Sequence, residues 1–130
     1  MIALDTNILV RYFVGDDPEQ SARAKALIEE QLNEDDPGLV STVVIVELDW
    51  VLQSIYGVSA ADVRAIIAKL LEARQLVIEH ADAVEAAIAG ANGDLADALI
   101  HETGRLNGCS HTITFDRKFA RMEGVELLAQ

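Results

Sequence analysis

Four acidic side chains in this sequence are candidates for shared chemistry: Asp5, Glu47, Asp97 and Asp116. Carboxylates gathered in one crevice repel one another at pH 7, so either some are protonated or divalent cations neutralise them. Ligand sets made only of oxygen select hard ions such as Mg²⁺ and Mn²⁺. Such ions can activate water and orient a phosphodiester for hydrolysis. The four acids therefore predict a hydrolytic site that depends on Mg²⁺ or Mn²⁺, provided that the fold brings them together.

Asp5 follows the apolar run 1–4, which predicts a short buried strand. Thr6 and Asn7 can then cap a helix over residues 8–14. Ligands of open α/β sheets bind at the carboxyl ends of the strands, where helix N-termini point into the crevice. This position favours a functional role for Asp5. The simpler alternative is that Asp5 only caps the helix after it.

Asp97 and Asp116 occupy similar positions near the other end of the chain. Asp116 ends a predicted strand over 110–115, in which apolar residues alternate with threonines. Asp94 opens a predicted helix, and Asp97 lies in its first turn. Both helix acids could simply stabilise the helix N-terminus. If Asp97 joins the site, Asp94 can support it or remain only a cap.

Glu47 lies on a predicted helix over 42–56. At 100° per residue it falls on the apolar side of this helix, and we expect it to be buried there. An unpaired charge in such a place is costly, so it would need a cation, a metal ion or a raised pKa. There are two alternatives to a functional role: Glu47 pairs with an arginine, or the segment forms a strand that exposes it. Its expected neighbours are Val43, Val44, Trp50 and Val51.

Strands that alternate with helices predict an α/β fold. We expect one domain over 1–130 with three layers, α/β/α, around a central and mainly parallel sheet of four or five strands. The remaining predicted strands are 39–41, 76–78 and 125–128, and the remaining predicted helices are 18–32, 59–71, 81–91 and 117–122.

Charge restricts how the chain can bind nucleic acid. Ten Lys and Arg residues against 22 Asp and Glu residues give a net charge of −12, which opposes broad electrostatic attraction to phosphates. A phosphate substrate must therefore be held locally, by metal ions or by a small basic cluster. Arg117, Lys118 and Arg121 form such a cluster just after Asp116, although they could also be a solvated helix face. The acidity suits a basic protein partner, or serves solubility alone.

The single cysteine, Cys109, excludes an intrachain disulfide and fits a reducing compartment. No apolar run approaches the ~18 residues that a membrane span needs. We therefore expect a cytoplasmic protein without a membrane partner.

Four short motifs occur in order along the chain, and together they resemble the PIN-domain ribonucleases, especially the VapC-type toxins of type II toxin–antitoxin pairs. The first motif contains Asp5, the second places Glu47 after Ser41, the third surrounds Asp97 and the fourth ends on Asp116. The resemblance extends from residue 1 to the last predicted strand. In sequence letters the first, third and fourth motifs are Leu4-Asp5-Thr6-Asn7, Leu95-Ala96-Asp97-Ala98-Leu99-Ile100 and Thr114-Phe115-Asp116.

The resemblance implies a catalytic quartet of Asp5, Glu47, Asp97 and Asp116, with Asp5, Asp97 and Asp116 as metal ligands. It assigns supporting roles to three further polar residues, namely Thr6, Asn7 and Thr114. It also implies a Mg²⁺- or Mn²⁺-dependent endoribonuclease that acts on a structured RNA such as tRNA or rRNA. A homodimer and a cognate VapB-type antitoxin that binds DNA are further implications of the family.

Two other functions compete with this interpretation. A phosphatase could use Asp5 as its nucleophile, but that chemistry wants an acid two residues later, where this chain has Asn7. A non-catalytic module could use the acidic pocket only to bind a metal or a partner. A substitution of Asp5 that removes cleavage but keeps the fold would separate these possibilities.

Overall fold

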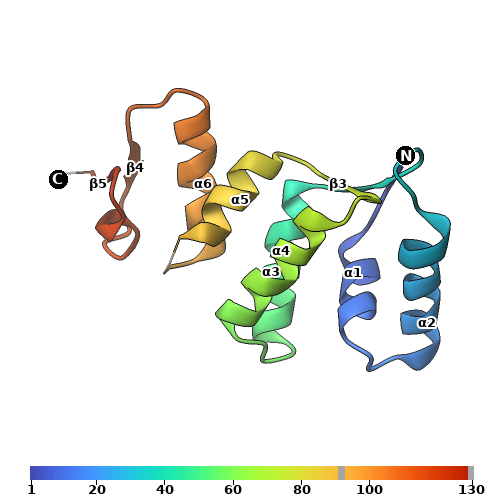
Figure 1. Ribbon diagram of the computed structural model, residues 1–130. Helices are drawn as coiled ribbons and strands as arrows, with labels where there is room; N and C mark the ends of the chain where they lie inside the picture. Colours follow the sequence, from blue (N-terminus) through green and yellow to red (C-terminus); the bar gives the residue numbers. More distant parts are fainter. Residues whose placement is uncertain (91–92, 129–130) are drawn as a thin grey trace. The chain divides into compact units, whose positions relative to one another are not determined.

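A computed structural model describes residues 1–90 and 93–128 of the chain (Figure 1). The chain forms two compact units, Met1–Ala81 and Asp82–Gln130, which are described separately. All strand pairings in both units are parallel, and helices connect the strands. The predicted α/β class with a mainly parallel sheet is therefore confirmed.

The first unit contains a three-stranded parallel sheet in the order β1-β2-β3. In its register Ile2 lies opposite Gly38, and Gly38 lies opposite Leu76. Because the strands are parallel, their carboxyl ends meet at one edge, and Asp5 and Ser41 follow two of these ends. The elements are β1 (Ile2–Ala3), α1 (Thr6–Phe13), α2 (Pro18–Ala26), a π-helical turn η1 (Leu27–Gln31), β2 (Gly38–Val40), α3 (Thr42–Ser54), α4 (Ala60–Glu72) and β3 (Leu76–Ile78).

Side-chain caps determine where the helices of this unit begin. Asp17 accepts a hydrogen bond from the Gln20 amide at 3.0 Å, and Pro18 occupies the first turn of α2, as predicted. The α1 cap differs from the prediction. Asp5 caps this helix, because Thr6 is already helical and its amide donates to Asp5 Oδ1 at 2.7 Å. The other caps are Ser41 for α3 and Ser59 for α4.

Leucine and isoleucine side chains fill the core of the first unit. Helix α1 packs against α2 and α3, and α3 packs against α4 (Figure 1). This packing supports α1, which begins directly after Asp5. It also supports α3, whose N-terminal half contains Glu47. The largest completely buried side chains of the unit are Leu9, Ile45, Leu48, Leu52 and Ile67.

The second unit contains a two-stranded parallel sheet, β4-β5, in which Thr112 lies opposite Val125. Asp94 caps α6 by accepting a hydrogen bond from the Asp97 amide at 3.1 Å. The predicted end of the preceding helix at Ala91 and the turn at Asn92 lie outside the described residues. The elements of this part are α5 (Ala81–Ala89), α6 (Leu95–Leu106), β4 (Thr112–Thr114), a 3₁₀ turn η2 (Phe119–Arg121) and β5 (Val125–Leu127).

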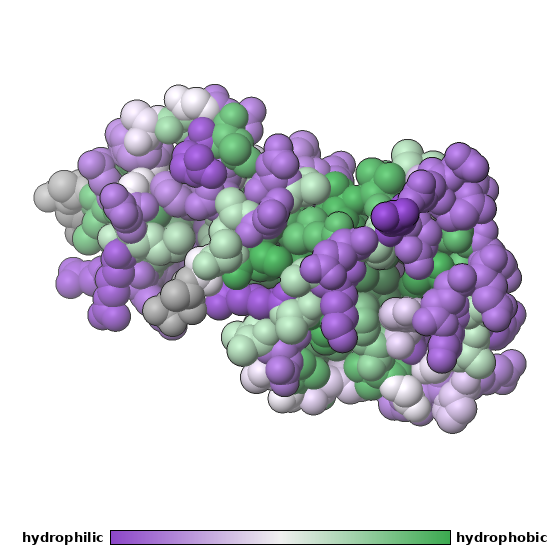
Figure 2. Space-filling view, viewed as in Figure 1, coloured by the Kyte–Doolittle hydropathy of each residue, from purple (hydrophilic) through white to green (hydrophobic). Residues whose placement is uncertain are grey.

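Hydrophilic side chains cover much of the visible surface over α2 (Figure 2). None of the described helices combines the length and the apolar character needed to cross a lipid bilayer.

Candidate functional site

The first unit brings two of the predicted acids to one hollow. Asp5, at the carboxyl end of β1, and Glu47, on α3, both line a space of about 290 Å³. Thr6 and Asn7, from the first turn of α1, line the same hollow. Two acids and two of their predicted supporting residues therefore lie together in this unit.

Glu47 is exposed, which corrects the prediction that it is buried on an apolar face. Helix α3 turns a different side toward the core, so the expected neighbours Val43 and Trp50 are 65% and 61% exposed. The physical reason is that α3 is apolar on more than one side, and packing against α1 and α4 selects which side is buried. The buried residues of α3 are Val44, Ile45, Leu48 and Leu52. Glu47 consequently reaches the hollow without the cost of burial.

Thr6 has the one unpartnered buried hydroxyl found among the described residues. Its side chain is only 6% exposed, and its Oγ1 makes no hydrogen bond within that part of the chain. Leaving such a group unsatisfied costs about 1–3 kcal/mol. Thr6 also lines the hollow beside Asp5. This is the setting expected of a residue that supports a neighbouring carboxylate.

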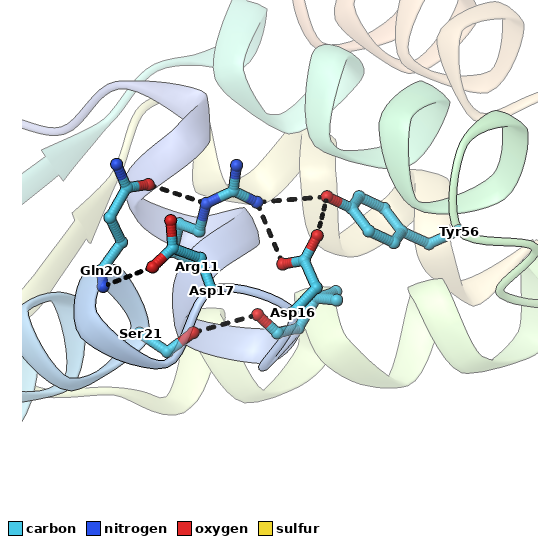
Figure 3. A network of polar contacts seen from close by, with 7 residues as sticks. Arg11, Asp16, Asp17, Gln20, Ser21 and Tyr56 are labelled. Carbon is cyan, nitrogen blue, oxygen red and sulfur yellow. Dashed lines mark hydrogen bonds and ion pairs between the residues drawn. The ribbon is translucent and has the colours of Figure 1, made fainter.

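A polar network holds Arg11 at the rim of the same hollow (Figure 3). Its Nε donates to Gln20 Oε1 at 2.8 Å, and its Nη1 donates to Asp16 Oδ1 and to the Tyr56 hydroxyl, both at 3.1 Å. Tyr56 in turn donates to Asp16 Oδ2 at 2.9 Å. The hydrogen bond with Tyr56, and then the charge of Asp16, raise the pKa of Arg11. No local sequence pattern indicates this network, since Tyr56 lies 45 residues from Arg11.

The second unit gathers three acids. Asp94, Asp97 and Asp116 line a hollow of about 200 Å³ together with Lys118. Asp116 Oδ1 accepts hydrogen bonds from the amides of Lys118 at 2.8 Å and Phe119 at 3.2 Å. Oδ2 takes no part in these two hydrogen bonds. Of the predicted basic cluster, Lys118 alone lines the hollow.

Thr114, the third predicted supporting residue, stands at the end of β4. Its Oγ1 accepts a hydrogen bond from the Asp116 amide at 3.0 Å. The threonine therefore holds the backbone turn that carries Asp116, which is a positioning contact.

Asp97 has a perturbed carboxyl group. Partial burial raises its pKa, and the negative charges of Asp94 and Asp116 raise it further, while Lys118 acts in the opposite direction. The negative potential that disfavours the charged form of Asp97 is the same potential that attracts a cation. Within the second unit, the acids of this hollow would therefore favour a cation electrostatically.

The carboxylates fit a hard metal ion with few protein ligands. In the described residues no group of three or more His, Cys, Asp or Glu side chains is arranged to hold a metal ion. Mg²⁺, however, usually keeps several waters and takes only one or two carboxylates from the protein. Asp97 and Asp116 can supply these oxygens in the second unit, and Asp5 can supply another in the first.

The raised pKa of Asp97 makes stability depend on pH in a defined direction. In metal-free protein, an acid whose pKa is higher when folded than when unfolded binds more protons in the folded state, so stability falls as pH rises. Relative to Asp97→Asn, wild type should lose stability from about its ordinary pKa of 3.8 upward. The difference should stay below about 1 kcal/mol, because the group is only partly buried.

Urea unfolding in EDTA at several pH values measures this difference. Asp62→Asn, which changes a first-turn acid of α4 outside the hollow, is the matched control. A wild-type advantage that grows with pH would contradict the electrostatic description of Asp97.

Comparisons with known proteins bear on the whole chain. A protein-family model described as PIN domain matches residues 2–125. A search of curated proteins gave no significant match. The matched region includes all four predicted quartet positions and the supporting residues of both units.

Proposed function

Because the chain belongs to the PIN domain family, whose members are generally metal-dependent nucleases, we propose that it is a Mg²⁺- or Mn²⁺-dependent endoribonuclease. The observation that supports this most directly is the hollow of Asp94, Asp97 and Asp116, where partial burial and then the charges of the other two acids raise the pKa of Asp97. Such a group of oxygen ligands suits a hard cation beside a phosphodiester.

We further propose that residues 1–130 act as one domain and that its catalytic residues are Asp5, Glu47, Asp97 and Asp116. Asp5, Asp97 and Asp116 would hold the metal, which lowers the pKa of bound water and neutralises charge on the phosphate. Hydrogen bonds within the chain position the acids. Cap hydrogen bonds orient Asp5 and Asp116, and Thr114 holds the Asp116 turn. Thr6 and Asn7 line the hollow beside Asp5.

The biological setting in this proposal comes from the resemblance to VapC-type toxins. The chain would cleave tRNA or rRNA in the cytoplasm as a homodimer, until a VapB-type antitoxin blocks its site. The net charge of −12 suits a basic partner segment. The phosphatase alternative is less well supported, because Asn7 stands where that chemistry wants an acid.

The substrate class is tested by incubating the purified chain and Mg²⁺ with a labelled RNA and with a DNA of the same sequence. We expect internal cleavage of the RNA and at least about 100-fold slower cleavage of the DNA, since the 2′-hydroxyl distinguishes the two. DNA cleaved as fast as RNA would contradict the proposal. A stable aspartyl-phosphate on Asp5 would instead support the phosphatase.

A further inference from the structure

Helices α1 and α2 enclose a second hollow in the first unit, with a volume of about 560 Å³. Its polar lining consists of two arginines and three side-chain amides, namely Arg11, Arg23, Asn7, Gln20 and Gln31. Within the described residues no Asp or Glu lines it. In a chain with 22 acidic and 10 basic residues, such a composition marks a local site for an anionic ligand.

This hollow adjoins the one that contains Asp5 and Glu47, because Asn7 and Arg11 line both. Gln20 Oε1 and the Asp16–Tyr56 pair hold the Arg11 guanidinium at Nε and Nη1, so its Nη2 is the group left for a ligand (Figure 3). Arg23 is exposed on α2 and makes no ion pair with any residue that the structure describes. One arginine is thus preorganised, and the other is available to a ligand.

We propose that this hollow, called here the α1–α2 hollow, binds the RNA strand next to the phosphodiester that is cut. Arg11 and Arg23 contact phosphates, and the amides of Asn7, Gln20 and Gln31 bond to base edges. The volume lies in the range of roughly 300–1,000 Å³ typical of ligand sites, and accommodates a nucleotide. Side-chain amides match the donor and acceptor pattern of bases, which favours RNA over an acidic peptide. The inference rests on the proposed nuclease function.

The first test compares Arg23→Gln with Arg74→Gln on a short single-stranded RNA. Arg74 is 86% exposed, pairs with Glu34 and lines neither hollow, so its substitution removes the same charge elsewhere on the unit. For Arg23→Gln we expect KM to rise about five-fold, as for one lost ion pair. We expect kcat to stay within about two-fold, because Arg23 lies outside the Asp5 hollow. The Arg74→Gln chain should match wild type.

A second test locates the contact on the RNA. Shortening the RNA by one nucleotide at a time should raise KM for wild type at the step that empties the α1–α2 hollow. The same step should raise KM less for Arg23→Gln, because one of the contacts in the hollow is already absent. Anisotropy of a fluorescent RNA should also show a salt dependence of binding whose slope is smaller by about 0.7 in this variant.

These measurements separate the two proposals. Cleavage by wild type with identical KM and salt slope in both arginine variants would overturn the α1–α2 hollow and leave the nuclease intact. Absence of cleavage would overturn the nuclease, while the anisotropy comparison would still decide whether the hollow binds RNA. Weaker binding of an oligo-glutamate peptide by Arg23→Gln, with RNA binding unchanged, would overturn the inference in favour of a protein ligand.

Discussion

Replacing Asp5 with Asn should reduce RNA cleavage by at least about 100-fold, the typical loss when one electrostatic contact to a transition state is removed. The fold should be unaffected. Asp5 Oδ1 accepts the Thr6 amide as the cap of α1, and an Asn side chain keeps an oxygen for this hydrogen bond. Initial rates on a labelled RNA and the midpoint of thermal unfolding measure both effects.

Asp17→Asn provides a matched control for this experiment. Asp17 caps α2 in the same way, through a hydrogen bond from the Gln20 amide at 3.0 Å, but it lines neither acid hollow. Its substitution should therefore leave cleavage within about two-fold while it changes stability as little as Asp5→Asn does. If both variants cleave RNA like wild type, Asp5 is a cap only, and the catalytic assignment is wrong.

Local signals predicted the positions of several elements well. The caps Asp17, Ser59 and Asp94 stand one residue before the helices they start, because capping depends only on nearby backbone amides. The strand predicted over 76–78 is β3 itself. These features need no information from distant parts of the chain, and a single sequence therefore contains enough to place them.

Features that depend on tertiary packing were harder to predict. The predicted orientation of Glu47 was wrong. Helix α3 has apolar residues around most of its circumference, and packing against neighbouring helices decides which side is buried. The π-helical turn at Leu27–Gln31 and the Arg11–Asp16–Tyr56 network had no local signal either. The number of strands agrees with the expected four or five, and the strands pair in parallel within each unit, three in the first and two in the second.

The site shows the same division between local and distant information. Motif order identified acids that do lie together within each unit, Asp5 with Glu47 and Asp97 with Asp116. It did not indicate the unpartnered Thr6 hydroxyl or the α1–α2 hollow, since both arise from how helices pack. The joint action of all four acids remains a prediction, and the effect of metal removal tests the metal dependence on which it rests.

Removal of divalent metal should abolish cleavage. Partial burial and then the charges of Asp94 and Asp116 raise the pKa of Asp97, and a cation that neutralises these acids would also offset charge on the phosphate. Metal ions supply several kcal/mol of transition-state stabilisation, so EDTA should slow cleavage by at least about 100-fold. Excess Mg²⁺ or Mn²⁺ should restore it, because oxygen ligands prefer hard ions. Rates on one RNA before EDTA, in EDTA and after replenishment measure the effect.

Thermal unfolding separates a metal bound by the acids from one bound only by RNA. Without RNA, Mg²⁺ at 100 times its Kd should stabilise wild type by about 2.7 kcal/mol, because ligand binding shifts the folding equilibrium. Asp97→Asn removes one proposed ligand and should show a clearly smaller shift at the same concentration. Asp62→Asn, an acid of α4 outside both acid hollows, should behave as wild type does. Full cleavage in EDTA, or equal Mg²⁺ shifts in all three chains, would mean that the carboxylates do not form a metal site.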